Sequence, residues 1–161
     1  MIISNTTPLS CLLKIGKADL LQRLYGEITI PQEVAMELDE AGPIHEGWRR
    51  QLRFLHLSPP APDDPVMALL LAEVDLGEAA AIALARRTDC DLLIIDDMAG
   101  RRLARRLRVP VTGTVGVVLA AAEQHLVDKP FALLNDLRTH GGLWLSDSFL
   151  EQLRSSWKPR S

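Results

Sequence analysis

The chain has 161 residues, of which 47% are hydrophobic and 24% charged, so it can form a sizeable core as a single domain over residues 1–161. This composition excludes wholesale disorder. Its formal net charge is −3, so any nucleic acid must be bound by a local basic patch, and with only 4% aromatic residues a broad base-stacking platform is not expected.

The sequence gives no sign of export or membrane insertion. The segment 1–17 lacks the basic start and the long apolar stretch of a signal peptide. The longest apolar runs are far shorter than the roughly 18 residues of a membrane span. Only two cysteines occur, Cys11 and Cys90, and they lie far apart. We therefore expect a reduced, cytoplasmic protein with no membrane partner.

Short apolar strands alternate with helical segments along the chain. In chain order, the first half of the pattern predicts a strand at 2–4, a turn at 5–8, helices at 9–15 and 19–25, a strand at 27–30, a helix at 31–40 and a strand at 54–57. A proline-rich loop follows at 58–65. The second half predicts helices at 65–74 and 76–87, a strand at 91–95, a helix at 98–107, a strand at 109–111, a helix at 115–124 and a last helix at 130–139. This alternation predicts an α/β fold with a mostly parallel sheet covered on both faces.

Polar residues follow several of these strands. Asn5 follows the first, Asp96 and Asp97 follow the strand at 91–95, and Thr112 and Thr114 follow the strand at 109–111. In a parallel sheet, ligands bind beyond the carboxyl ends of the strands. If these strands are neighbours, their trailing residues gather at one edge of the sheet.

Two glutamates on helices are candidates to join that edge. Glu37 flanks the apolar stripe of the helix at 31–40, which is equally compatible with an exposed glutamate. Glu78 lies in the first turn of its helix, where Asp75 is a candidate cap and the helix dipole favours an anion. The small residues that follow Glu78 allow tight packing, which would hold its carboxylate near the sheet.

The adjacent pair Asp96 and Asp97 also has two interpretations. One aspartate after a strand is a good helix cap, and Asp96, at the strand end, is expected to take that role and leave Asp97 as a ligand. Two carboxylates side by side repel each other unless a cation lies between them. Oxygen ligands without histidine or cysteine suit Mg²⁺ or Mn²⁺, which can activate water against a phosphodiester.

A run of arginines follows the aspartate pair. Arg101, Arg105 and Arg108 oppose the apolar side of the helix at 98–107, while Arg102 and Arg106 flank it. A solvated helix face explains the run as well as RNA binding does. In the functional interpretation, Arg102 and Arg106 contact the RNA backbone, and their contribution would show as salt-dependent affinity.

The order and spacing of these segments resemble those of PIN domains over nearly the whole chain. The similar segments are the opening at 2–9, the segments at 30–38, 77–85 and 93–104, and a region at 109–116 and 142–146 that resembles a VapC-like branch of poorly characterised function. The resemblance implies a three-layer α/β/α sandwich and a Mg²⁺- or Mn²⁺-dependent ribonuclease centre. It also implies that the protein is the toxin of a toxin–antitoxin pair, that it binds an antitoxin protein, and that it forms a homodimer.

In this resemblance the metal is held by Asn5, Glu37, Glu78, Asp97 and, as an alternative, Asp96. Asn5 departs from the family pattern, which has aspartate there, so one negative charge is missing and weaker metal binding is expected. The alternative function is therefore a catalytically weak or inactive module that binds RNA or a partner protein. A phosphatase with an aspartate nucleophile after the first strand is disfavoured, because Asn5 cannot be that nucleophile.

Overall fold

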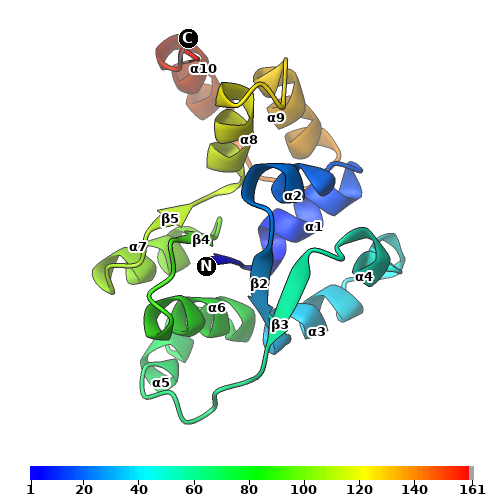
Figure 1. Cartoon of the computed structure of the whole chain (residues 1–161). Coiled ribbons are helices and arrows are strands. Elements are labelled where there is room, and N and C mark those ends of the chain that lie inside the picture. The colour runs from blue at the N-terminus through cyan, green and yellow to red at the C-terminus, as the bar shows by residue number, and fades with distance from the viewer. Residues whose placement is uncertain (160–161) are drawn as a thin grey trace.

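The structure is a computed structural model that describes residues 1–159. Its centre is a five-stranded sheet in the order β3-β2-β1-β4-β5, and every neighbouring pair of strands is parallel (Figure 1). The strands are β1 (Ile2–Ser4), β2 (Ile28–Pro31), β3 (Leu55–Ser58), β4 (Leu92–Ile94) and β5 (Val111–Thr112). The predicted parallel α/β sandwich is therefore confirmed.

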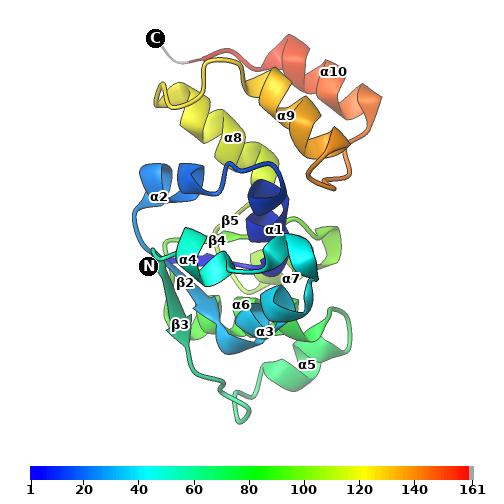
Figure 2. The ribbon, with the colours of Figure 1, turned by 90° about the vertical axis from the view of Figure 1, so that its right-hand side faces the viewer.

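Helices connect the strands and cover the sheet. They are α1 (Thr6–Lys14), α2 (Asp19–Tyr25), α3 (Gln32–Glu40), a 3₁₀ turn η1 (Pro43–His45), α4 (Trp48–Gln51), α5 (Met67–Leu71), α6 (Leu76–Arg87), α7 (Met98–Arg106), α8 (Thr114–Glu123), α9 (Pro130–Thr139) and α10 (Asp147–Ser156). Within residues 1–159, none of these helices has the length and apolar character needed to cross a bilayer. Helices α8, α9 and α10 lie together on one side of the molecule (Figure 2).

Several elements differ from the sequence prediction: α5 is shorter than the predicted helix at 65–74, and η1 and α4 were not predicted. The expected turn at 5–8 is wrong, because α1 begins at Thr6 and includes Pro8 in its first turn, where proline is tolerated. Helix α10 was not predicted. Its start carries an ordinary signal, since the Ser146 hydroxyl accepts a hydrogen bond from the Phe149 N–H at 3.1 Å.

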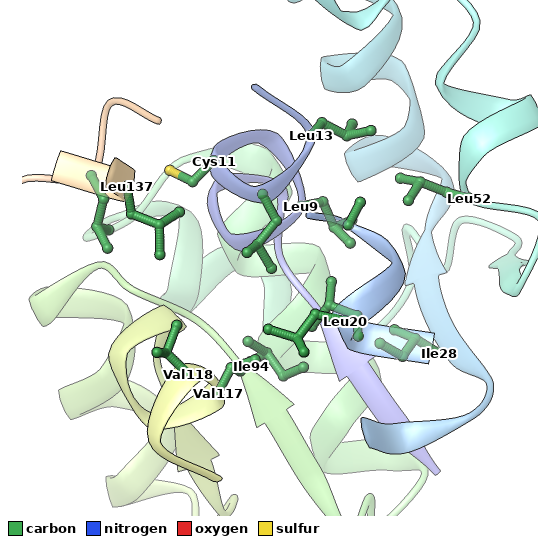
Figure 3. Close-up of a cluster of buried hydrophobic side chains, with 14 of the residues drawn as sticks. Leu9, Cys11, Leu13, Leu20, Ile28, Leu52, Ile94, Val117, Val118 and Leu137 are labelled. Atoms are coloured by element: carbon green, nitrogen blue, oxygen red, sulfur yellow. The ribbon is translucent and has the colours of Figure 1, made fainter. Parts of the chain in front are cut away.

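The sheet separates two apolar cores because successive strand residues point to opposite faces. Ile94 packs with residues of α1, α2, α8 and α9 (Figure 3). Leu93 and Ile95 instead pack with α5, α6 and α7 on the other face. All three of these β4-region side chains are fully buried. This double burial explains why the strand is continuously apolar.

The strand order reverses between β1 and β4, which are neighbours in the centre of the sheet. Ser4 pairs with Ile94 in register, and the Asn5 N–H donates to the carbonyl of Ile94 at 2.9 Å. The carboxyl ends of both strands therefore meet at the switch point, where open α/β sheets bind their ligands. Asn5, Asp96 and Asp97 follow these two strand ends.

Candidate active site

Asn5 lies at the switch point with an unpartnered side-chain oxygen. It occupies the N-cap position of α1, but its side chain makes no capping hydrogen bond. The residue is only 2% exposed, and its Oδ1 has no hydrogen-bond partner among the described residues. A buried amide oxygen left without a donor is costly. A cation at this position would give the oxygen a partner.

Glu37 reaches the same region from α3. Its Oε2 accepts a hydrogen bond from the Thr6 hydroxyl, and Thr6 is the residue next to Asn5. Its Oε1 accepts the Gly77 N–H at 3.1 Å. Glu37 is therefore half-buried between the starts of α1 and α6, and the interpretation as a freely exposed helix-face glutamate is wrong.

Glu78 is held at the start of α6 by a reciprocal capping box with Asp75. The Glu78 N–H donates to Oδ1 of Asp75 at 2.9 Å, and the Asp75 N–H donates to Oε2 of Glu78 at 3.3 Å. Burial raises the pKa of Glu78 to about 7, and the negative charge of Asp75 adds to the rise. The capping role expected for Asp75 is present, and it orients Glu78 as well.

Asp97, and not Asp96, caps the helix that follows the strand. Asp97 is the N-cap of α7, and its Oδ2 accepts the Gly100 N–H at 2.8 Å. Asp96 instead accepts from Thr114, at 2.7 Å from the N–H and 2.6 Å from the hydroxyl. The expectation that Asp96 caps the helix is wrong, because its side chain leaves the strand toward α8.

The charges of Glu37, Glu78 and Asp97 act on one another. The negative charges of Asp97 and Glu37 both raise the pKa of Glu78, so three segments distant in sequence share one acidic environment. Within residues 1–159, no three His, Cys, Asp or Glu side chains form a ready-made metal-binding group. In this structure the carboxylates are instead bound by donors of the protein, which are the N–H groups of Gly77, Asp75 and Gly100 and the Thr6 hydroxyl.

The donor set nevertheless fits a hard divalent cation. Every candidate ligand atom is a carboxylate or amide oxygen, the type of ligand that Mg²⁺ and Mn²⁺ prefer. A cation would give the unpartnered Oδ1 of Asn5 a partner, and it would favour the ionised form of Glu78, whose pKa is raised first by burial and further by the charges of neighbouring acids. Asp96 is the least available candidate, since both of its oxygens already accept from Thr114.

The arginines of α7 divide into two groups. Arg102 and Arg106 are exposed, as contact with a nucleic-acid backbone requires. Arg101 is half-buried, and burial lowers its pKa, with the charge of Arg105 adding to the lowering and Asp96 opposing it. The helical periodicity placed Arg101 on the solvent-facing side of this helix. In the structure the β5–α8 turn packs against it, so closely that a Cβ added to Gly113 would lie 2.5 Å from Nη1 of Arg101.

Sequence reasoning missed the residues that orient the acids. Thr6 and Gly77 fix Glu37 through contacts that span 31 and 40 positions, and Thr114 holds Asp96 across 18 positions. Only the folded topology brings these partners together. A signal existed for Gly77 alone, since a glycine in the first turn of a helix often marks a close approach.

Gly77 provides a direct test of the Glu37 position. A Cβ added there would lie 2.2 Å from Oε1 and 2.6 Å from Cδ of Glu37. Although alanine normally favours a helix, Gly77→Ala is expected to lower the free energy of unfolding by up to about 1 kcal/mol, because the Glu37 carboxylate must turn away and lose its hydrogen bonds from Thr6 and Gly77. Urea denaturation measures the change.

The matched control for this substitution removes the obstructing group. In a Glu37→Ala background, Gly77→Ala is expected to be neutral or stabilising by up to about 1 kcal/mol. The same destabilisation in both backgrounds contradicts the contact between Gly77 and Glu37.

The comparison with known proteins agrees with this fold. A family model described as "DUF3368: PIN domain" matches residues 1–159. The chain therefore belongs to the PIN-domain family. Proteins of this class are generally nucleases and usually use divalent metal ions. The comparisons with curated proteins and with solved structures gave no match.

Proposed function

We propose that the chain is a metal-dependent endoribonuclease that hydrolyses phosphodiester bonds in RNA. The observation that carries this proposal is the shared electrostatic environment of Glu37, Glu78 and Asp97 at the switch point of the sheet. A pocket of carboxylates alone repels a phosphodiester, so this arrangement is chemically useful for hydrolysis only together with a cation.

Asn5, Glu37, Glu78 and Asp97 would hold one or two Mg²⁺ or Mn²⁺ ions. When bound, such an ion lowers the pKa of a coordinated water and stabilises the negative charge that develops at the phosphorus-bound oxygens during in-line attack. The chain's own donors act on the ligands. Thr6 and Gly77 orient the carboxylate of Glu37, and the capping box orients that of Glu78.

Arg102 and Arg106 would bind the phosphates that flank the cleaved bond. Both are exposed on α7, the helix that Asp97 caps at its N-terminus, so they lie on the same element as a candidate ligand. Their contacts are expected to make RNA affinity fall as salt rises, since each phosphate contact releases counterions.

The biological role within this proposal is that of the toxin in a toxin–antitoxin pair, acting as a homodimer in the cytoplasm. The resemblance of the segments at 109–116 and 142–146 to a VapC-like branch supports it. An antitoxin partner would then have to block access to the acidic edge of the sheet.

Asn5→Asp distinguishes an active site from an inactive module. Asparagine supplies a neutral oxygen, so aspartate adds the fourth negative charge and is expected to raise the rate of RNA cleavage about tenfold in Mn²⁺. The assay compares parent and variant on a labelled RNA, with Mn²⁺ and with a chelator.

The alternative is a non-catalytic module that binds RNA or a partner protein, and the asparagine at position 5 is the feature that favours it. In that case neither the parent nor Asn5→Asp cleaves RNA in Mn²⁺. Cleavage that persists in chelator contradicts the dependence on metal.

A further inference from the structure

A cavity of about 420 Å³ opens beside the candidate active site. It lies between the start of α7, the β5–α8 turn and the segment that joins α9 to α10. Asp96 and Arg101 line one part of it, and Trp144, Leu145 and Phe149 line another. Asp96 follows the carboxyl end of β4 and Gly113 follows that of β5, so the cavity lies at the same edge of the parallel sheet as Asn5 and Asp97.

The outer wall of this cavity is aromatic and exposed. Trp144 is 85% exposed and Phe149 42%, in a chain that has few aromatic residues. Met98, from the first turn of α7, is also exposed on the cavity. A tryptophan this exposed contributes little to the apolar core, so its flat ring is available to a ligand.

One end of the cavity holds the guanidinium of Arg101 near the carboxylate of Asp96, whose oxygens are occupied by Thr114. The guanidinium of Arg101 is half-buried there, and among the described residues it forms no ion pair. Glycines at this end let neighbouring side chains pack directly against the backbone. A Cβ on Gly113 would lie 2.5 Å from Nη1 of Arg101, and one on Gly116 would lie 2.1 Å from Oγ1 of Thr112.

We propose that this cavity binds one base of single-stranded RNA next to the cleaved phosphodiester. The base stacks on the indole of Trp144, and Arg101 binds the adjoining phosphate or the edge of the base. This inference rests on the proposed ribonuclease function and adds to it a binding site for one unpaired base, formed by Trp144 and Arg101.

Charge favours RNA over a protein segment as the occupant. The cavity combines a flat aromatic wall with an unpaired cation, and the neighbouring surface of α7 carries Arg102, Arg105 and Arg106, all exposed. This cluster of positive charge stands out in a chain of net charge −3. An aromatic face beside a basic surface is the usual arrangement for binding single strands without strict sequence preference.

The test is equilibrium binding of a short labelled single-stranded RNA to the full chain in chelator, where cleavage does not interfere. Trp144→Ala is expected to weaken binding about tenfold, equivalent to about 1.4 kcal/mol, while Trp144→Phe stays within about threefold of the parent. Leu69→Ala is the control, since Leu69 is 73% exposed but lies outside the cavity, and it is expected to bind like the parent.

An abasic nucleotide separates stacking from a merely structural role of Trp144. An oligonucleotide carrying it is expected to bind the parent more weakly, with no further loss on Trp144→Ala. Unchanged affinity of Trp144→Ala, or no RNA binding by the parent, overturns the inference. So does a dimer that Trp144→Ala converts to monomers in sedimentation equilibrium without changing RNA affinity, because a second copy then covers the cavity.

Failure of this inference is distinguishable from failure of the proposed function. If the parent cleaves RNA in Mn²⁺ and Trp144→Ala binds RNA as well as the parent does, the ribonuclease proposal stands and only the base-binding cavity is contradicted. A parent that binds RNA through Trp144 but never cleaves it retains the pocket and is a binding module.

Discussion

Glu78→Gln is expected to lower the rate of RNA cleavage at least about 100-fold in Mg²⁺ or Mn²⁺. The substitution keeps the size of the side chain and an oxygen that can accept the Asp75 N–H, but it removes one negative charge from the proposed metal ligands. Even residues that only orient metal ligands typically cost about 10- to 100-fold when replaced. Cleavage of a labelled RNA under single-turnover conditions measures the effect.

The same substitution is expected to stabilise the metal-free fold at pH 8. The pKa of Glu78 is raised from 4.5 to about 7, so the folded chain holds this proton more tightly than the unfolded chain does. Stability is therefore lost as the pH rises through this interval, and Gln avoids that loss. Thermal melting in chelator is expected to show a higher midpoint for Glu78→Gln at pH 8 and no difference at pH 4.

The cleavage rate and the melting temperature of Glu78→Gln together distinguish the loss of a functional group from unfolding of the variant. A variant that is more stable and yet inactive has lost a functional group and not its fold. Asp97→Asn serves as the companion substitution in the cleavage assay. Parent-like cleavage by both variants contradicts the assignment of Glu78 and Asp97 as ligands.

Asp96→Ala is expected to lower the free energy of unfolding by about 2–4 kcal/mol. Both carboxylate oxygens accept from Thr114, and Thr114 is fully buried, so the alanine leaves an N–H and a hydroxyl without partners. Asp97→Ala removes a single helix cap and is expected to cost only about 1 kcal/mol. Urea denaturation of the two variants measures the difference.

Thr114→Val provides the matched control for this pair. It removes the hydroxyl that donates to Asp96 and keeps the backbone N–H and the shape of the side chain, so it is expected to cost about 1 kcal/mol. In the Thr114→Val background the cost of Asp96→Ala should become smaller. Equal losses for Asp96→Ala and Asp97→Ala contradict the structural role given to Asp96.

The fold class could be predicted because it depends on local patterns. The continuous apolar run that contains β4 is typical of a strand covered on both faces, and α9 was predicted with its bounds, Pro130–Thr139. Helix α10 was missed although Ser146 and Asp147 form an ordinary start signal, because the prediction placed the last helix at 130–139.

The hydrogen bonds within the candidate site could not be predicted, because they join segments that are distant in sequence. The periodicity of α3 left Glu37 equally compatible with solvent and with the protein. The Thr6 hydroxyl and the Gly77 N–H, 31 and 40 positions away, decide between them. The roles of Asp96 and Asp97 were likewise undetermined. Which of them caps the helix depends on the direction in which each leaves the strand, and on the position of Thr114 at the start of α8.

The central position of β1 has a consequence for how the chain folds. This three-residue strand pairs on one side with β2 and on the other with β4, so Ile3 lies beside both Thr29 and Leu93. Ile3 and Leu93 are 90 positions apart in the chain. The long loop between them must close before their pairing contributes any stability, which slows folding. The switch point at Asn5 is therefore expected to form late, and until β4 pairs, one edge of β1 exposes unpaired N–H and C=O groups that can pair with another chain.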